Sequence, residues 1–377
     1  MTAEAFNVDE FRGHFPHLEH LAHLASCSQG AFSREVNYAL SDLMRSLHLS
    51  GAPWDTWMTE VETLRKEFAA LLNTTTEHIA LVPTASAGAY QVASGFRWQG
   101  GRILTSALEF PSVGQVFQAQ RANGANINYI EDRQLALEAE SWRNQLDAET
   151  KLVSVPLASY HNGDMADVVN IIHHAQMQGA ATFIDAYQAA GVVPIDVQAL
   201  DCDYLVTGTL KYLLGLAGVA CLYVKDIDRA ERTPEFTGWF GRRNPFGFDP
   251  QDTSFPQEAR RFEGGTPAIP SVYASVAGLR LINSTDQRSG FAHVMGVREY
   301  ASTELHKVGI DVNQPENTDR WGPQIAAKVP NPDTAAAELA AQNIITAPRN
   351  DVLRLSLHYY STTSDIDKAV SALRKLV

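Results

Sequence analysis

The sequence predicts an α/β protein in which helices cover both faces of a mostly parallel sheet. From residue 74 onward, short apolar runs alternate with segments of helical periodicity. Strands that are separated by helices pair in parallel through right-handed crossovers. Three further apolar runs, each bounded by Gly or Asp, are typical of buried strands and lie at Thr182–Ile184, Tyr204–Val206 and Val219–Val224.

The chain has 377 residues, which fits one large and one smaller domain. We expect residues 1–32 to form an N-terminal segment that joins the small domain. Residues 33–280 are expected to form the large domain, and residues 281–377 a small C-terminal α/β domain.

Composition excludes several classes of partner. The net charge of −13 argues against nucleic acid or an anionic membrane. No stretch is long and apolar enough to span a bilayer, and the first residues carry acids where a signal peptide has basic residues. Cys27, Cys202 and Cys221 lack metal-type spacing and fit a reducing compartment. We therefore expect a soluble cytoplasmic protein without a bound metal.

The first 32 residues show no clear periodicity, and we expect them to be irregular. His14, His17, His20 and His23 recur at every third position, which suggests metal ligation. Pro16 breaks any helix there, however, and no regular acidic partners accompany the histidines. We interpret them as residues of an entry segment rather than as ligands.

Two helices are expected next. The first covers residues 33–49 and opens at Ser33. The second carries one continuous apolar face, formed by Trp54, Trp57, Val61, Leu64, Phe68 and Leu71. Its two tryptophans fit core or subunit packing better than a ligand wall.

The alternating region is expected to begin with a strand, a tight turn at Thr84–Gly88 and a helix. Its strands are predicted at Ile79–Val82, Arg102–Thr105, Ile127–Ile130 and Leu152–Pro156, and its helices at Ala89–Phe96, Ser112–Asn123, Ala136–Leu146 and Val168–Met177. A long irregular segment, residues 234–262, follows the sheet. The C-terminal part is predicted to contain helices at Phe291–Val308, Asp333–Gln342 and Ser364–Leu376 and strands at Asn343–Thr346 and Val352–Leu357.

Polar residues follow several of the predicted strands. Asp185 closes one run and Lys211 follows the next, while Thr84–Gly88 and Glu109–Ser112 follow earlier strands. Ligands of such sheets bind beyond the carboxyl ends of the strands, so all four groups are expected in one cleft. A lysine that can form a Schiff base, beside a carboxylate that keeps a pyridine nitrogen protonated, is what pyridoxal 5′-phosphate (PLP) chemistry requires. Either residue alone is more often a solvated lysine or a helix cap.

Small residues in the turn after the first strand indicate an anion site. They are expected to leave the backbone N–H groups of Ala87 and Gly88 free at a helix N-terminus. The turn matches neither the dinucleotide fingerprint nor the phosphate-loop pattern. It indicates a phosphate cup only in combination with Asp185 and Lys211.

The order of these motifs resembles the class V aminotransferase family of fold-type I PLP enzymes, which includes cysteine desulfurases, kynureninases and several aminotransferases. The motifs are Thr84-Ala-Ser-Ala-Gly, Glu109-Phe-Pro-Ser112, Asp185-Ala-Tyr-Gln188, Thr207-Gly-Thr-Leu-Lys211 and Arg261-Phe-Glu-Gly-Gly-Thr266-Pro. The resemblance covers residues 20–280 well and the C-terminal part loosely. It implies the fold-type I architecture, a PLP cofactor and an amino acid substrate.

The resemblance assigns roles around the cofactor ring. Lys211 is implied to be the Schiff-base lysine and Asp185 the partner of the pyridinium nitrogen. Gln188 is implied to bind the ring hydroxyl, and Phe110 to stack on the ring face. Arg354 matches the arginine that grips the substrate α-carboxylate, a task that suits a planar guanidinium.

The resemblance also assigns contacts around the phosphate and the substrate. Ala87, Gly88 and Thr209 are implied to hold the phosphate, and Thr266 to reach the phosphate of the neighbouring subunit of a homodimer. Trp239 resembles a kynureninase tryptophan near that phosphate. Ser28 lies in the segment that flanks the active site in this family and is expected to contact the substrate.

The simplest function that the resemblance implies is an aminotransferase. Kynureninase-like or other lyase chemistry is an alternative, although Val113 and Gln188 depart from the kynureninase pattern. A cysteine desulfurase needs a mobile thiol shortly before Arg354, and residues 344–351 contain no cysteine. Cys27 flanks the site and is more consistent with a structural role.

Two alternatives from other classes of protein fit the sequence less well than a PLP enzyme. A binding module with the same fold would not be expected to retain Asp185, Gln188, Lys211 and Arg354 together. A nucleotide-binding α/β protein would need a phosphate-loop lysine or a dinucleotide fingerprint, and the sequence has neither. The arginines of the irregular segment remain open to two interpretations, either lining the cleft for an acidic substrate or forming surface salt bridges: Arg242, Arg243, Arg260 and Arg261.

Overall fold

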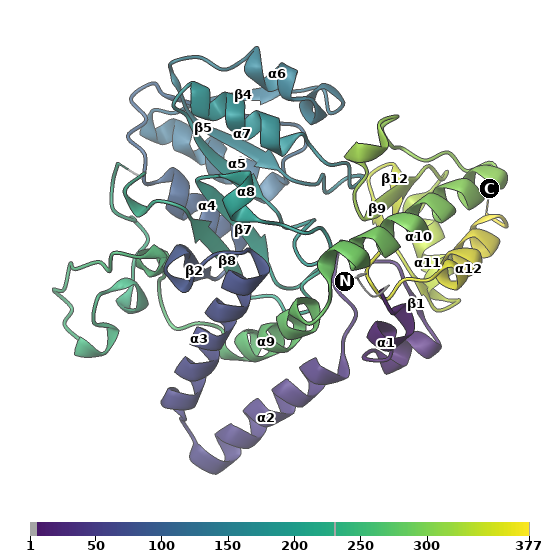
Figure 1. Cartoon of the computed structure of the whole chain (residues 1–377), viewed down its shortest axis with the longest axis horizontal. Helices are drawn as coiled ribbons and strands as arrows, with labels where there is room; N and C mark the ends of the chain where they lie inside the picture. Colours follow the sequence, from purple (N-terminus) through teal and green to yellow (C-terminus); the bar gives the residue numbers. More distant parts are fainter. Residues whose placement is uncertain (1–5, 230, 377) are drawn as a thin grey trace, which may run out of the picture.

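A seven-stranded sheet forms the centre of the computed structural model, which describes residues 6–229 and 231–376 (Figure 1). The strand order is β2-β8-β7-β6-β5-β3-β4. The strands are β2 (Ile79–Val82), β3 (Arg102–Ser106), β4 (Asn126–Ile130), β5 (Thr150–Pro156), β6 (Ala181–Asp185), β7 (Tyr204–Gly208) and β8 (Ala220–Val224). The predicted fold class, an α/β protein with a mostly parallel central sheet, is confirmed.

Strand β8 runs against both of its neighbours. Strands β3, β4, β5, β6 and β7 pair in parallel, whereas β8 pairs antiparallel with β7 and with β2. Residues 209–219 join β7 to β8 without a helix, and so short a link cannot make a parallel crossover. The sheet is therefore mostly parallel, as predicted, with β8 as the exception. Strand β2 keeps the direction of β7, so its carboxyl end reaches the same edge of the sheet.

Helices pack on both faces of the sheet. Helices α4 (Ala85–Ala93) and α5 (Pro111–Ala119) share one apolar cluster with Phe183 and Val206. Helix α7 (Val168–Met177) packs on the opposite face, in a second cluster that contains Val155 and Ile184. The short helices α6 (Ala139–Arg143) and α8 (Val197–Leu200) complete the cover.

Two of the predicted helices differ from the observed ones. Helix α4 begins at Ala85 rather than Ala89, because the Thr84 hydroxyl caps it by accepting the Ala87 N–H at 3.1 Å. The helix expected at Ala136–Leu146 is interrupted by extended backbone at Glu138. The turn before this break is held by the Trp142 indole, which donates to the Ala136 carbonyl at 2.9 Å.

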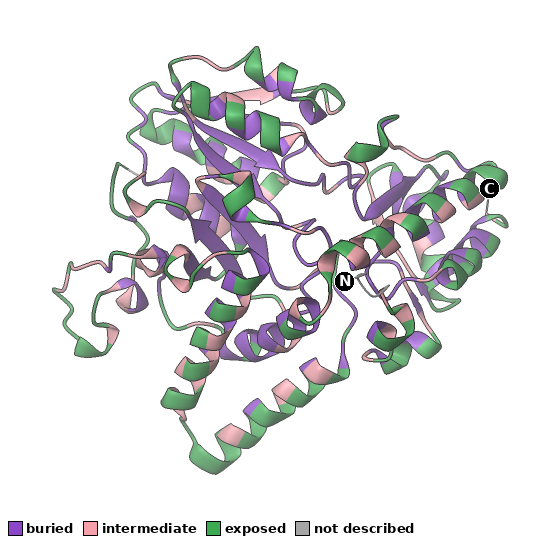
Figure 2. Ribbon diagram, viewed as in Figure 1, coloured by how far each residue is buried: buried purple, intermediate pink, exposed green. Residues whose placement is uncertain are grey.

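Helices α2 (Arg34–Ser50) and α3 (Trp54–Leu71) form a long hairpin that projects from the sheet and packs on α9 (Ile269–Asn283) (Figure 1). Ser33 caps α2 as predicted, since its hydroxyl accepts the Val36 N–H at 3.2 Å. Figure 2 shows that much of α2 is exposed, whereas α9 is largely buried.

The C-terminal part contains a three-stranded antiparallel sheet of order β11-β12-β9. Its elements are α10 (Gln287–Lys307), β9 (Gln324–Ala327), α11 (Pro332–Ala340), β10 (Ile344–Ile345), β11 (Ala347–Arg349), β12 (Val352–Ser356) and α12 (Thr363–Leu373). Strand β9 was not predicted, because its alanines carry little strand propensity. Helix α12 begins one residue before the predicted start, and Thr362 caps it in a capping box with Asp365.

The N-terminal segment is more regular than expected and bridges distant parts of the chain. Asn7 caps a short helix, α1 (Val8–Arg12), and β1 (Ala22–His23) pairs in parallel with β10. Ala25 forms a bridge with Ser356 of β12. Farther along, the Gly30 N–H donates to the Leu210 carbonyl at 2.9 Å. The segment therefore ties the C-terminal strands to the loop that carries Lys211.

The remaining regular structure consists of single 3₁₀ turns. They lie at Pro16–Glu19, Thr76–His78, Gln120–Asn123, Leu135–Leu137, Ile227–Arg229, Trp239–Gly241, Pro245–Gly247, Ala259–Phe262 and Thr318–Arg320. Residues 234–262 contain no longer helix or strand, as predicted. Among the described helices, none is long and apolar enough to cross a membrane.

Candidate active site

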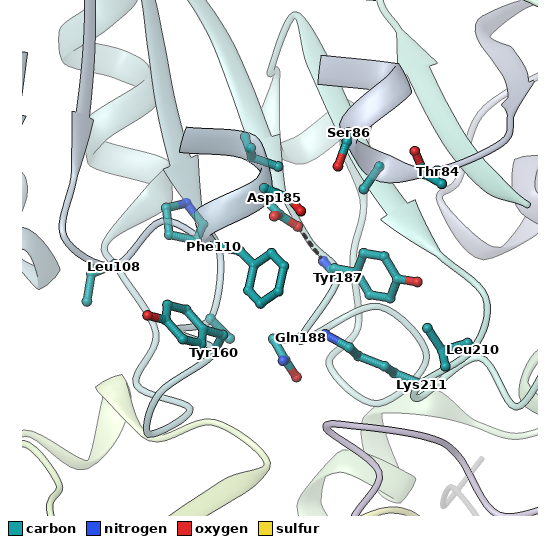
Figure 3. A pocket seen from close by; sticks show the side chains of 15 residues that line it. Thr84, Ser86, Leu108, Phe110, Tyr160, Asp185, Tyr187, Gln188, Leu210 and Lys211 are labelled. Carbon is teal, nitrogen blue, oxygen red and sulfur yellow. Dashed lines mark hydrogen bonds between the residues drawn. The ribbon is translucent and has the colours of Figure 1, made fainter. Parts of the chain in front are cut away.

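A cavity of about 280 Å³ opens at the carboxyl ends of the strands. The segments that follow β2, β3, β5, β6 and β7 each contribute to its wall, through Thr84, Phe110, Tyr160, Tyr187 and Lys211 (Figure 3). This volume is close to the lower end of the range for small-molecule sites, about 300–1,000 Å³. The strand order therefore creates one pocket from residues that are far apart in the sequence.

Asp185 and Lys211 both line this cavity. Asp185 is the last residue of β6 and is 5% exposed, and its Oδ1 accepts the Tyr187 N–H at 2.8 Å. The Nζ of Lys211 lies 4.4 Å from the centre of the Tyr187 ring and 5.5 Å from that of Phe110. Burial lowers the pKa of Lys211 to about 8, so a larger share of its amine is neutral and nucleophilic at neutral pH.

Glu109 is a second buried carboxyl group next to Asp185. Its Oε1 accepts the Phe110 N–H at 2.9 Å, and its Oε2 accepts the Ser154 hydroxyl at 2.8 Å. Burial and the neighbouring charge of Asp185 raise the pKa of Glu109 above its ordinary value. Burial also raises the pKa of Asp185, while the Tyr187 N–H and Lys211 act in the opposite direction.

Gln188 lines the cavity with an unsatisfied amide. Its Nε2 donates to the Cys27 carbonyl at 3.3 Å. Its Oε1 is buried and has no hydrogen-bond partner among the residues that the structure describes. A buried acceptor without a donor is costly, so this oxygen favours a ligand that supplies one.

The N-terminus of α4 presents free amides to the cavity, but from different residues than expected. The N–H of Ala87 donates to Thr84 Oγ1 and that of Gly88 to the Thr84 carbonyl, each at 3.1 Å. Because α4 begins early, the amides without an acceptor in the described chain are those of Ala85 and Ser86. Gly88 packs against β7, where an added Cβ would lie 3.0 Å from Val206 Cγ2.

The side chains of several predicted site residues lie outside the cavity wall, among them those of Thr209, Ser28 and Thr266. The Thr209 hydroxyl donates to the Leu216 carbonyl at 2.7 Å, with the Val219 carbonyl at 3.2 Å as a second acceptor within reach, which fixes the Lys211 loop. Ser28 is exposed in the segment beside Gln188, and Thr266 is exposed before α9. Their roles toward a ligand remain predictions.

Trp239 lies in an aromatic cluster rather than at the cavity. Its ring contacts Trp54, Phe240, Phe246 and Phe248, with centroids 4.3–5.9 Å away. Phe246 and Phe248 are 49% and 74% exposed. Its place near a phosphate stays a prediction.

Arg354 approaches the cavity from the C-terminal sheet. It is 1% exposed, and its Nε donates to the Ala347 carbonyl at 3.1 Å. Its Nη1 donates at 2.7 Å to the carbonyl of Tyr160, a cavity residue. Its Nη2 is buried without a partner in the described chain. One face of the guanidinium is thus available for a carboxylate.

The arginines of the irregular segment do not line the cavity. Arg260 pairs with Glu258 at 3.0 Å, and Arg261 lies 3.9 Å from Asp228. The Arg242 guanidinium stacks on the Phe255 ring at 4.5 Å. The ion pairs favour the salt-bridge interpretation for Arg260 and Arg261.

Sequence reasoning missed two aromatic residues of the wall. The Tyr160 ring packs edge-on against the Phe110 ring, with centroids 5.2 Å apart. The position of Tyr160 shortly after the end of β5 is the sequence signal that could have identified it. Tyr187 lies within a motif already singled out, yet only the structure shows its contact with Gly208. A Cβ on Gly208 would overlap the Tyr187 ring, so this position must remain glycine for the ring to pack there.

The described residues contain no cluster of His, Cys, Asp and Glu that could hold a metal ion. His14 instead contacts Glu35 at 2.7 Å, and His23 contacts the Tyr360 hydroxyl at 3.2 Å.

The chain is similar to known proteins over almost its entire length. The family model "Aminotransferase class-V" matches residues 44–369. A Bacillus subtilis (strain 168) protein named "Uncharacterized aminotransferase YcbU" is 33% identical over 366 residues, which is 97% of each chain. A cysteine desulfurase of Escherichia fergusonii is 25% identical over 412 aligned positions, with 98% of each chain covered.

Solved structures share the fold. A mutant of C-DES, with glycine covalently linked to its PLP cofactor, superposes with a TM-score of 0.89 at 21% identity and covers 97% of this chain and 99% of its own. A cysteine desulfurase from Thermococcus onnurineus NA1 superposes with a TM-score of 0.86 at 20% identity, covering 98% of each chain. The resemblance inferred from the sequence is therefore confirmed, and the chain belongs to the class V aminotransferase family of fold-type I, PLP-dependent enzymes.

Proposed function

We propose that the chain is a PLP-dependent aminotransferase that acts on an amino acid. The observation that carries this proposal is the convergence of Lys211, Asp185 and the Phe110 ring in one cavity. The cavity also offers groups without protein partners, namely Gln188 Oε1 and the free amides at the start of α4. These acceptors and donors fit an aromatic ring that carries a hydroxyl and a phosphate.

The bound cofactor supplies an electron sink that stabilises negative charge at the substrate Cα. With PLP bound, Lys211 would hold it through a covalent bond and would serve as the base at the substrate Cα, a task that the lowered pKa of its amine favours. Asp185 would hold the ring nitrogen, and Phe110 would line the ring. The free amides of Ala85 and Ser86 would hold the phosphate, at the helix start for which Ala87 and Gly88 were predicted, while Thr209 holds the Lys211 loop.

Arg354 binds the substrate α-carboxylate in this proposal. Two of its three nitrogens are fixed by the carbonyls of Ala347 and Tyr160, which orients Nη2 without using it. A charge-assisted hydrogen bond to a carboxylate is strong in a buried setting. Ser28 would contact the same substrate in this proposal, since it follows Cys27, whose carbonyl meets Gln188.

We further propose that the active form is a homodimer. The exposed aromatic rings of Phe246 and Phe248 surround Trp239 and form an apolar surface that a second copy would cover. Thr266 is exposed and able to reach across such an interface. Light scattering measures the mass of the particle in solution and tests this part. We expect twice the chain mass for wild type and a lower mass for Phe248→Asp.

The function is tested by spectroscopy of the PLP-loaded protein. We expect a visible absorption band that a reactive amino acid converts to the pyridoxamine form, with release of the matching keto acid. Release of keto acid or alanine with the band retained would indicate a lyase instead. A protein that stays colourless after incubation with PLP would contradict the proposal.

A lyase or sulfur-transfer reaction is the second candidate, because the chain resembles a cysteine desulfurase and the C–S lyase fold. The structure gives little room for a mobile thiol, since Cys27, Cys202 and Cys221 are all buried. Cys27 is held on both sides, by its N–H to Ser356 Oγ at 2.9 Å and by its carbonyl to Gln188.

Replacing Cys27 with alanine should therefore leave the amino acid reaction nearly intact. We expect a loss of less than about tenfold in kcat, or less than ~1.4 kcal/mol in activation free energy. Keto acid formation measures the first reaction, and sulfide release from cysteine measures the alternative. Loss of both by orders of magnitude would make Cys27 a nucleophile and would contradict the assignment.

A further inference from the structure

We propose that Glu109 is a second carboxyl group of the cofactor site. Glu109 and Asp185 together hold one proton; Glu109 carries it, and Asp185 is the only anion of the pair. The purpose of this arrangement rests on the proposed function. The pairing of two buried carboxyl groups is a property of the chain itself and can be tested separately.

Strand register places the two groups side by side. Pro156 of β5 is the Cα partner of Asp185 on β6, and Ser154 lies two residues earlier on the same face of the sheet. Glu109 Oε2 accepts the Ser154 hydroxyl at 2.8 Å, so the carboxyl group lies over β5 beside Asp185. The two residues are 7% and 5% exposed.

Charge balance then decides the protonation of the pair. Lys211 is the cation that acts on Asp185 from the loop after β7. The other titratable side chains beside the pair are Tyr187 on the β6 side and Tyr129 from β4, which meets Glu109 across Gly114. Neither tyrosine brings a positive charge. One cation balances one carboxylate, and a second anion in a dry interior would be uncompensated.

Local contacts assign the proton to Glu109. Asp185 accepts the Tyr187 N–H and is acted on by Lys211, and both interactions favour its charged form. The Ser154 hydroxyl and the Phe110 N–H favour the charged form of Glu109, but burial and the charge of Asp185 oppose its ionisation more strongly, and no cation among the described residues acts on it. A neutral Glu109 still accepts the Phe110 N–H, so it also orients the residue whose ring lines the cavity. Glu109 is therefore a positioning residue.

The apoprotein provides the first test. Burial and the charge of Asp185 raise the pKa of Glu109 from 4.5 to about 8. A carboxyl group with a raised pKa contributes stability at low pH that is lost as pH rises through the folded-state value. As the pH rises from 4.5 to about 8, we expect the denaturant midpoint of wild type to fall relative to that of Glu109→Gln, because the variant has no carboxyl proton to lose.

Two further variants sharpen the result. Ser154→Ala removes a hydrogen-bond donor that favours the ionised form of Glu109. The fall of the denaturant midpoint should therefore extend to higher pH in this variant. Glu338→Gln, on an exposed position of α11, should follow wild type. Parallel pH profiles for wild type, Glu109→Gln and Ser154→Ala would overturn the proposal. If Glu109→Gln does not fold, the Ser154→Ala shift alone decides it.

The PLP-loaded protein provides the second test. The visible band of wild type should change with pH in a transition that Glu109→Gln lacks, because ionisation of Glu109 alters the charge beside the ring nitrogen. A band whose pH dependence is identical in the two proteins would overturn the link to the cofactor. A protein that forms no band contradicts the proposed function, whereas the apoprotein result still tests the carboxyl pair.

Discussion

Replacing Lys211 with alanine is expected to abolish the visible band of the PLP-loaded protein and to lower kcat by roughly 10²–10⁴-fold or more. The variant loses both the covalent attachment point and the base at the substrate Cα. Asp185 and the amides of α4 remain, so noncovalent binding of PLP should persist. Absorbance and keto acid formation measure the two losses in one sample.

Lys225→Ala is the matched control for this variant. Lys225 follows the next strand, β8, and forms an ion pair with Asp201 at 2.7 Å with a side chain that is 40% exposed. Its removal deletes the same charge from the same sheet without touching the cavity. Full activity in Lys211→Ala would show that the chemistry lies elsewhere.

Replacing Arg65 with alanine is expected to destabilise the protein by about 3–5 kcal/mol, the usual cost of leaving a buried charge without its partner. Arg65 is 4% exposed, and its Nη1 contacts Glu263 Oε1 at 2.5 Å and the Ile79 carbonyl at 2.8 Å. Glu263 in turn accepts the Leu81 N–H at 2.9 Å. The pair thus satisfies the open side of the edge strand β2.

Chemical denaturation followed by circular dichroism measures this effect. Arg280→Ala removes one half of an exposed pair with Glu67, in which the arginine side chain is 59% exposed, and should cost no more than about 1 kcal/mol. The double variant Arg65→Met with Glu263→Leu should regain part of the loss, because it leaves no unpaired charge. Equal losses for the exposed and the buried arginine would contradict this account.

The sequence predicted the central sheet well because its strands are short, apolar and bounded by Gly or Asp. Strand β2 and helix α7 have the predicted bounds. The antiparallel course of β8 depends on how the short segment between residues 209 and 219 closes, and periodicity carries no information about strand direction. Strand β9 was not predicted, because its pairing with β12, rather than its own residues, makes it a strand.

In the candidate site, too, some features could be predicted from the sequence and others could not. The convergence of Asp185 and Lys211 followed from strand ends alone, since parallel strands bring their carboxyl ends to one edge. Which amides of α4 are free depended on a one-turn shift of the helix start, set by the Thr84 hydroxyl. The burial of Glu109 next to Asp185 required knowledge of register across β5 and β6, which no local pattern provides.

The N-terminal segment has a consequence for the order in which the protein is completed during synthesis. Strand β1 has no partner until β10 has left the ribosome, and Ala25 waits for Ser356. The central sheet ends at residue 224 and can therefore form while the first thirty residues are still unpaired. The contact of Gly30 with the Leu210 carbonyl needs only the first 210 residues, whereas pairing with β10 and β12 requires the C-terminal strands. The segment therefore reaches its complete set of partners only when nearly the whole chain has been synthesised.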